Sequence, residues 1–363
     1  MNVLIVNSAH GKYPVGSEGW IQATRTAVRE IAATGSVFIC STEPLPWDLV
    51  TWLAGASGAH MRLIVKTAAG ERGYLEFERL TVDFSLDRER VAPLFFTAEP
   101  PLIQAHPKDS WQVRDRLAFA AAEAIYPVSI RPEGRLERLM QEPEFRSRIR
   151  NDFRIPWTPC GFIPRYTLTG RSWRPLSPGE WLVHWTRACP GKWPGEAMHE
   201  YFHDMFANGT VYARNAAETL LRIIGESRIR GSSWKMPGGA HAVALTSLSP
   251  GDAIKLMRWR KRYVHLAFEP YGIAIRKEEL VERGAGKVRY VRSGELSTET
   301  DLFAHAAGEE DGWMREREWR LSGDLDMSSI SRRAVAAIVP DEQAVRDLRG
   351  RIPADFPIHA LFE

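Results

Sequence analysis

The stretch Asn2 to Asn7 reads NVLIVN, a short apolar run of the kind that forms a buried parallel strand. Alternating helical and strand patterns follow it, with helices at 20–33 and 46–56 and strands at 37–40 and 61–65. Strands that alternate with helices are joined by right-handed crossovers, so the order predicts a parallel, doubly wound sheet. We therefore expect an α/β domain over residues 1–155.

Two further segments of this half carry expectations. Residues 72–90 are charged and alternate in places, which indicates a hairpin or an insertion. Arg114 and Asp115 lie in a helical pattern and are expected to form a surface pair, which contributes little to stability.

Ligands of doubly wound sheets bind beyond the carboxyl ends of the strands, here residues 7–11, 41–43 and 96–99. Lys12 and the glycines after it could present a phosphate site, although the spacing matches no known phosphate fingerprint and a plain loop is the simpler interpretation. The half loosely resembles Rossmann-like nucleotide-sensing proteins of the SLOG class and the DNA-processing protein that shares their fold. That resemblance implies a domain that binds or senses a nucleotide.

The composition is that of an ordinary globular protein, with 363 residues, 44% hydrophobic and 26% charged. No apolar run reaches the ~18 residues that cross a bilayer, so we expect no membrane segment and a cytoplasmic protein. The three cysteines are far apart and give neither a disulfide framework nor zinc spacing. We expect no metal site, and the sequence leaves the oligomeric state open.

A proline-rich segment, 156–180, separates this half from residues 181–363. The second part has an α+β pattern with short strands, which predicts a mixed or antiparallel split sheet. Its most unusual stretch is 311–320, DGWMREREWR. If that stretch is a strand, its two-residue period places Glu316 and Glu318 on one face with Arg320 beside them. Two like charges this close raise a pKa or require a cation nearby, although the arginines of the stretch could simply neutralise them on a wet edge.

Two other strands carry polar residues in an apolar background. The stretch 181–187, WLVHWTR, presents His184 and Thr186 in alternation, and 241–247, HAVALTS, ends in Thr246 and Ser247. A single histidine on a strand is more often a hydrogen-bonded core residue than a catalyst. Only the three stretches taken together therefore indicate a function.

In this order the three stretches resemble the ADP-ribosyltransferase superfamily, which binds NAD across a split sheet. The resemblance implies that Glu318 is the catalytic glutamate, that Glu316 is an additional acid and that His184 orients the ribose. It also implies that Thr186, Thr246 and Ser247 contact the cofactor. Residue type and order add two further guesses to these: Arg187, Arg276 or Arg320 for the pyrophosphate, and Tyr271 to stack on nicotinamide.

The run from 181 to 326 also resembles an uncharacterised bacterial family related to abortive-infection proteins. The phrases HWTR, PGKWPGE, FEPYGIAIRK and EREWRLSGDLD carry this resemblance. It implies a toxin or a phage-defence effector. Together the two resemblances favour an NAD-dependent ADP-ribosyltransferase or NAD glycohydrolase with NAD as its substrate.

Two alternatives stay open from the sequence. The stretch 255–262, KLMRWRKR, combines cations with an aromatic ring and would suit a nucleic-acid face, with Arg258, Arg260, Lys261 and Arg262 as its contacts. In that case the protein is a non-catalytic binding protein or takes a nucleic acid as acceptor. The second alternative is a nuclease in which Glu316 and Glu318 hold a divalent metal.

Overall fold

The computed structural model describes residues 1–67, 70–96, 107–166, 176, 179–233, 236–260, 265–292, 301–307 and 316–362. The chain forms two compact units. One unit comprises residues 1–162 and 190–213, and the other comprises residues 163–189 and 214–363. We call them the N-terminal unit and the C-terminal unit.

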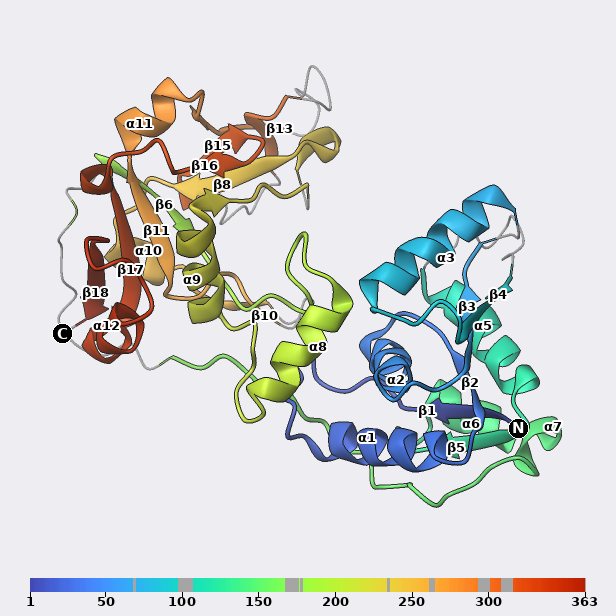
Figure 1. The fold of residues 1–363 in the computed structure, drawn as a ribbon. Helices are drawn as coiled ribbons and strands as arrows, with labels where there is room; N and C mark the ends of the chain where they lie inside the picture. The colour runs from blue at the N-terminus through green and yellow to red at the C-terminus, as the bar shows by residue number, and fades with distance from the viewer. Residues whose placement is uncertain are drawn as a thin grey trace. The chain divides into compact units, whose positions relative to one another are not determined.

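The N-terminal unit is built on a parallel sheet with strand order β4-β3-β2-β1-β5 within the described chain (Figure 1). This confirms the predicted α/β, Rossmann-like class. Its elements are β1 (Asn2–Val6), α1 (Gly19–Ala32), β2 (Val37–Cys40), α2 (Leu45–Ala56), β3 (Met61–Val65), α3 (Glu71–Asp83), β4 (Val91–Phe95), α5 (Pro107–Ala121), β5 (Ala124–Pro127), α6 (Arg135–Gln141), α7 (Pro143–Arg146) and α8 (Met198–Ala207).

Both faces of this sheet are buried, which explains why its strands read as continuous apolar runs. In β1, Val3 and Ile5 belong to a core shared with α1, α2, α3 and α8. Leu4 and Val6 point the other way and pack with residues of α5, α6 and α7. Alternate side chains of one strand therefore hold two helical layers.

Two expectations for this unit are wrong. The charged stretch 72–90 begins with the helix α3, because its buried residues Phe77, Leu80 and Thr81 recur at helical spacing and its charges lie on the solvent side. Arg114 and Asp115 are not a surface pair: their side chains are 0% and 1% exposed.

The C-terminal unit contains a mixed sheet with strand order β12-β15-β8-β6-β11-β17-β18 among the described residues. Neighbouring strands are antiparallel except β17 and β18, which are parallel, so the predicted α+β class is confirmed. The main elements are β6 (Trp181–Trp185), α9 (Ala216–Glu226), β8 (Ala242–Thr246), β11 (Gly272–Arg276), α11 (Lys277–Glu282), β12 (Gly286–Lys287), β15 (Glu318–Ser322), β17 (Val335–Asp341), α12 (Glu342–Arg349) and β18 (Ile358–Phe362).

Short elements surround this sheet. They are β7 (Arg228–Ile229), the 3₁₀ helix Pro237–Gly239, α10 (Pro250–Ile254), β9 (Trp259–Arg260), β10 (His265–Leu266), β13 (Arg289–Arg292), β14 (Ala304–Ala307), β16 (Leu325–Asp326) and the 3₁₀ helix Arg332–Ala334. The core lies between one sheet face and α9, α11 and α12, which contribute apolar residues such as Leu220, Leu280 and Leu348.

The division of the chain differs from the predicted boundary near residue 155 in one important respect. Residues 190–213 follow the first strand of the C-terminal unit but belong to the N-terminal unit. Within them, α8 lies beside α2 (Figure 1), and the ring of Phe202 stacks on Trp52 with centroids 5.3 Å apart. Tyr201, Phe202 and Met205 of α8 are buried in the same core as α1. The chain therefore leaves the C-terminal unit, completes the N-terminal core and returns.

Candidate functional site

A cavity of about 400 Å³ lies in the C-terminal unit where β6 and β8 separate. These two strands share a single residue pair, Val183 with Thr246, whereas β6 and β11 are paired over five residues. Side chains rather than backbone hydrogen bonds occupy the gap. The cavity is lined by Val183, His184, Trp185, Arg187, Met236, Ala244, Leu245, Thr246, Leu248, Ala253, Leu256, Arg260, His265, Ala267, Phe268, Glu316, Glu318 and Arg320.

The structure brings together some of the predicted site residues and not others. His184, Thr246, Glu316, Glu318, Arg187 and Arg320 line the cavity, together with Arg260. Thr186, Ser247, Tyr271 and Arg258 do not line it. Lys261 and Arg262 lie outside the described residues. The two predicted carboxylates and the predicted histidine therefore share one cavity, although His184 lies on β6 while Glu318 lies on β15 and Glu316 precedes it.

Glu318 is held by the buried guanidinium of Arg320, which lies two residues along β15 on the same face. Arg320 Nε donates to Glu318 Oε1 at 2.8 Å and Nη2 donates to Oε2 at 3.2 Å. Arg320 is 2% exposed and also donates through Nη1 to the carbonyl oxygen of Leu302. This geometry fixes the direction of the carboxylate.

Glu316 precedes β15 and is not on the strand, because the strand begins at Glu318. Arg317 between them has φ of +46°, in the left-handed region, so the alternation expected for a continuous strand is broken there. Thr246 Oγ1 donates to the carbonyl oxygen of Glu316, and the backbone nitrogen of Ser247 donates to that of Arg317 at 3.2 Å. Thr246 and Ser247 thus fix the backbone turn that directs Glu316 into the cavity.

The pKa of Glu316 is raised above that of an ordinary glutamate. Burial is the main cause, and the negative charge of Glu318 adds to it. Arg260 opposes the shift from 3.6 Å, the distance between its Nη2 and Glu316 Oε1. The two carboxylates therefore differ in environment. Glu318 has a close bidentate partner in Arg320, whereas Arg260 is farther from Glu316.

His184 turns its ring into the gap between β6 and β8. Its Nδ1 lies 2.8 Å from the carbonyl oxygen of Ala244. A carbonyl can only accept, so Nδ1 carries the proton and Nε2 is the acceptor. Burial lowers the pKa of His184, which favours the neutral ring.

Thr186 and Tyr271 have roles in the framework. The Thr186 hydroxyl donates to backbone oxygens of Ala216 and Tyr271, at 3.2 and 3.1 Å, and the residue is 3% exposed. The Tyr271 ring is partly buried and packs against the core of the C-terminal unit. Neither side chain is placed to contact a ligand in the cavity.

Glu269 was not singled out from the sequence, yet it is the most deeply buried carboxylate near the site, at 1% exposure. Its Oε1 accepts from the backbone nitrogen of Ala188 at 2.6 Å, and its Oε2 accepts from the hydroxyl of Tyr166. Burial raises its pKa, while these donors and nearby Arg187 lower it. Glu269 therefore fixes the loop that leaves β6 and carries Arg187. No local pattern indicates this role, because the partners of Glu269 are distant in the chain.

Two aromatic residues form an apolar wall that sequence reasoning also missed. The Trp185 and Phe268 rings stack with centroids 5.4 Å apart and planes 26° apart. The indole Nε1 of Trp185 is buried and has no hydrogen-bond partner among the described residues. A flat ring with a nearby acceptor would fit this wall.

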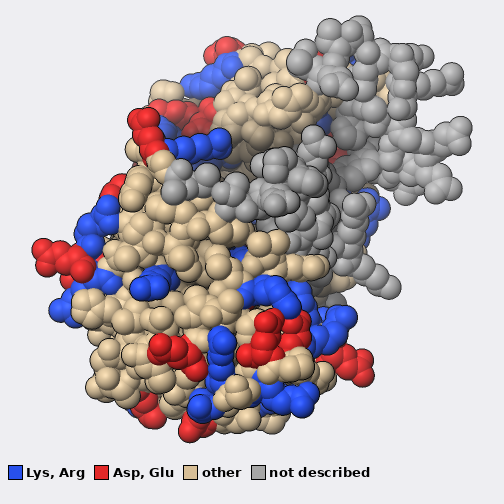
Figure 2. Space-filling view, turned by 90° about the vertical axis from the view of Figure 1, so that its right-hand side faces the viewer, with Lys and Arg blue, Asp and Glu red and all other residues tan. Residues whose placement is uncertain are grey.

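The arginines bear on the two alternatives. Arg260 pairs with Glu316 inside the cavity, so it does not belong to an exposed basic face, and on the face shown in Figure 2 the described Lys, Arg, Asp and Glu side chains are interspersed. Both glutamates already have arginine partners where a nuclease would place metal ions. Across the described part of the chain, no group of three or more His, Cys, Asp or Glu side chains could hold a metal.

We compared the chain with known proteins. No protein-family model, curated protein or solved structure matches it. None of the described helices is long and apolar enough to span a membrane.

Proposed function

We propose that the cavity of the C-terminal unit binds NAD and that the unit cleaves the nicotinamide glycosidic bond, as an ADP-ribosyltransferase or an NAD glycohydrolase. The observation that carries this proposal is the meeting of His184, Thr246, Glu316 and Glu318 at the gap in the sheet. The cavity volume of about 400 Å³ lies in the usual range for ligand cavities. Consumption of NAD by such a site would suit a toxin or a phage-defence effector.

Glu318 has the properties that cleavage of this bond requires. Glycosidic cleavage passes through a state in which the ribose carries developing positive charge. A carboxylate with a fixed direction stabilises that charge without reorganisation during the reaction. Arg320 donates to one lone pair on each oxygen of Glu318, and each oxygen retains a lone pair that can accept from a ribose hydroxyl.

The remaining groups suit the rest of the dinucleotide. Arg187 lines the cavity and can bind a pyrophosphate oxygen. The Trp185–Phe268 wall offers a surface for nicotinamide, and the unpartnered Trp185 Nε1 could donate to its amide oxygen. His184 Nε2, as an acceptor, is suited to a ribose hydroxyl.

Glu316 is the general base of this proposal, because its raised pKa brings it closer to neutral pH. It must be ionised to accept a proton from water or from an acceptor hydroxyl. Activity should therefore rise with pH through the pKa of Glu316, which lies above the ordinary value of 4.5. Glu316→Gln should abolish this acid limb, as measured by the pH dependence of kcat/KM for NAD cleavage.

Arg260→Met provides the matched test of that assignment. Arg260 lowers the pKa of Glu316, so its removal should raise that pKa further and move the acid limb of the profile to higher pH. At a pH well above the acid limb, Glu316 is ionised in both proteins, so the activity of Arg260→Met should be much closer to that of the wild type. A limb that stays in place in Arg260→Met would show that another group controls it.

The first experiment is nicotinamide release from NAD by the purified full chain, alone and with added DNA, RNA or cell extract. Release in the protein alone would identify a glycohydrolase. Release that requires an added macromolecule would identify a transferase and its acceptor class. No release under any of these conditions, with no NAD binding by calorimetry, would contradict the proposal.

A further inference from the structure

A second cavity, of about 480 Å³, lies entirely within the N-terminal unit. It opens beyond the carboxyl ends of β1 and β2, where ligands of parallel sheets bind, and residues 190–192 and α8 complete its wall. The cavity is separate from the C-terminal site. A ligand of this cavity would therefore bind whether or not the protein cleaves NAD.

Asp48 of α2 is the unusual residue of this cavity. It is 8% exposed, and its Oδ1 accepts from the backbone nitrogen of Glu43 at 2.9 Å. No described residue donates to its Oδ2, and no described Lys, Arg or His forms an ion pair with it. A buried carboxylate with one neutral donor is costly to maintain, because Lys66 and Arg114 compensate its charge only from a distance.

The loop that carries Asp48's donor is held rigidly. Glu43 has φ of +50°, a conformation unfavourable for a residue with a side chain. Arg114 donates through Nη1 to the carbonyl oxygens of both Thr42 and Glu43, and its guanidinium lies 4.4 Å from the Trp47 ring centroid. The wall of the cavity is therefore preorganised around the carboxylate.

A second acceptor in the cavity also lacks a donor. His10 Nδ1 lies 3.2 Å from the carbonyl oxygen of Thr158, so Nδ1 carries the proton and Nε2 is an acceptor. His10 Nε2 is buried with no partner among the described residues. The ring is stacked on Trp20 at 4.6 Å with planes 6° apart, which fixes its direction.

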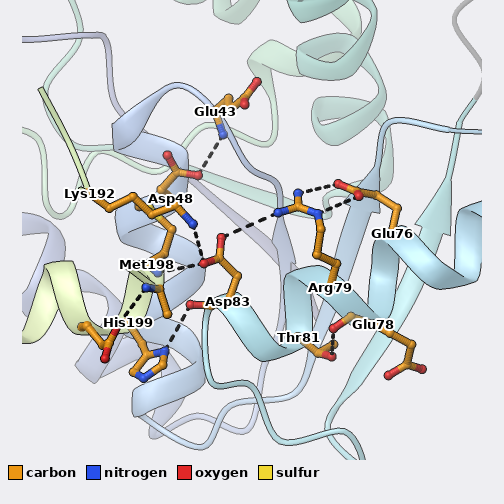
Figure 3. A network of polar contacts seen from close by, with 12 residues as sticks. Glu43, Asp48, Glu76, Glu78, Arg79, Thr81, Asp83, Lys192, Met198 and His199 are labelled. Carbon is orange, nitrogen blue, oxygen red and sulfur yellow. Dashed lines mark hydrogen bonds and ion pairs between the residues drawn. The ribbon is translucent and has the colours of Figure 1, made fainter. Parts of the chain in front are cut away.

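Cations lie on the same cavity wall. Lys192 Nζ is 2.6 Å from Asp83 Oδ1, and Arg79 Nη1 is 4.0 Å from the other oxygen, Oδ2, as Figure 3 shows. Asp83 also accepts from the backbone nitrogen of Met198, which ties α3 to the start of α8. Arg79 also donates to both carboxylate oxygens of Glu76, at 2.8 and 2.7 Å, so an anionic group would lie beside two cations that already have carboxylate partners. A group rich in N–H donors would find Asp48.

We propose that this cavity binds a purine nucleotide whose base has two adjacent N–H donors, the guanine type. The paired N–H groups meet the carboxylate of Asp48, as a guanidinium meets a carboxylate in a bidentate pair. A ribose hydroxyl donates to His10 Nε2, and the phosphate lies near Lys192 and Arg79. Each group that lacks a partner in the protein thereby gains one from a single ligand.

The test is calorimetric titration of the full chain with guanosine 5′-monophosphate at pH 7.5. We expect binding to the wild type and a loss of about 100-fold in affinity in Asp48→Asn, because the amide NH2 group cannot accept the second of the two N–H groups. Asp87→Asn is the matched control, since Asp87 is an exposed carboxylate of the same unit. Its affinity should equal that of the wild type.

Xanthosine 5′-monophosphate makes the test independent of folding defects. Xanthine replaces the exocyclic amine by an oxygen, so its edge complements an amide rather than a carboxylate. Asp48→Asn should bind it more tightly than the wild type does. No guanosine 5′-monophosphate binding to the wild type, or equal affinity of wild type and Asp48→Asn, would overturn the proposal.

Stability against pH gives an independent readout on the same carboxylate. Burial raises the pKa of Asp48 to about 6, helped by the charge of Glu43 and opposed by the Glu43 backbone donor, Lys66 and Arg114. The folded-state pKa lies above the unfolded value of 3.8, so ionisation of Asp48 destabilises the fold as pH rises from 3.8 through about 6. Asp48→Asn should raise Tm at pH 8 and leave it nearly unchanged at pH 4. An equal shift at both pH values would show that ionisation of Asp48 is not the cause.

Discussion

Glu318→Gln should lower the rate of nicotinamide release by about 10²–10³-fold, the loss typical of removing one electrostatic group from a reacting centre. The substitution keeps the size of the side chain and removes the charge that would stabilise the ribose cation. It should affect kcat more than KM, because the charge acts on the transition state. The measurement is steady-state nicotinamide release at saturating and limiting NAD.

The variant also leaves Arg320 buried without a carboxylate, so the fold needs its own control. The double variant Glu318→Gln with Arg320→Gln removes both charges of the pair and avoids an isolated buried cation. It should remain inactive while regaining some of any lost stability. Glu278→Gln, in an exposed position of α11, should retain full activity. Activity of the folded Glu318→Gln near that of the wild type would remove Glu318 from the mechanism.

Arg114→Met should lower the free energy of unfolding of the N-terminal unit by about 3–5 kcal/mol, the loss typical when one partner of a buried ion pair is removed. The guanidinium donates through Nε and Nη2 to Asp115 Oδ1 and through Nη1 to two backbone carbonyls. Methionine fills the space over Trp47 but leaves these acceptors with fewer donors. Asp115 keeps Arg135, 2.6 Å from its Oδ2, which limits the loss.

The matched control for Arg114 is Arg116→Met on the same helix. Arg116 is 53% exposed and pairs with Glu142 and Glu144, so its removal should lower stability by less than about 1 kcal/mol. Urea denaturation followed by fluorescence and circular dichroism measures both variants. Similar small losses in the two variants would show that the buried pair contributes no more than a surface pair.

The fold was predictable to the extent that it depends on local patterns. The apolar run at 2–7 and its alternation with helices are consequences of a sheet buried on both faces, and they indicate its class directly. The helix at 71–83 was missed because its exposed face is densely charged and its apolar residues, such as Leu75 and Phe77, also fit a two-residue period. Only its packing against the sheet decides between the two periods.

The site was predictable for residues whose role follows from their own stretch. The pairing of Glu318 with Arg320 follows from their spacing on a strand. The position of the Arg260 side chain in the cavity does not follow from the sequence, because it depends on the pairing of two short strands, β9 and β10. Glu269, Trp185 and Phe268 likewise have roles set by tertiary contacts that no sequence period reports.

The passage of residues 190–213 into the N-terminal unit affects how the two units can be separated or exchanged. A fragment that ends at residue 155 lacks Tyr201 and Phe202 and would expose the apolar surface that α8 covers. A single crossover in the gene between the codons for residues 163 and 189 would likewise give one product that lacks α8 and another whose α8 lacks the N-terminal core. Neither unit can therefore be exchanged as a module by one crossover, because the N-terminal unit is made from two separate segments of the chain.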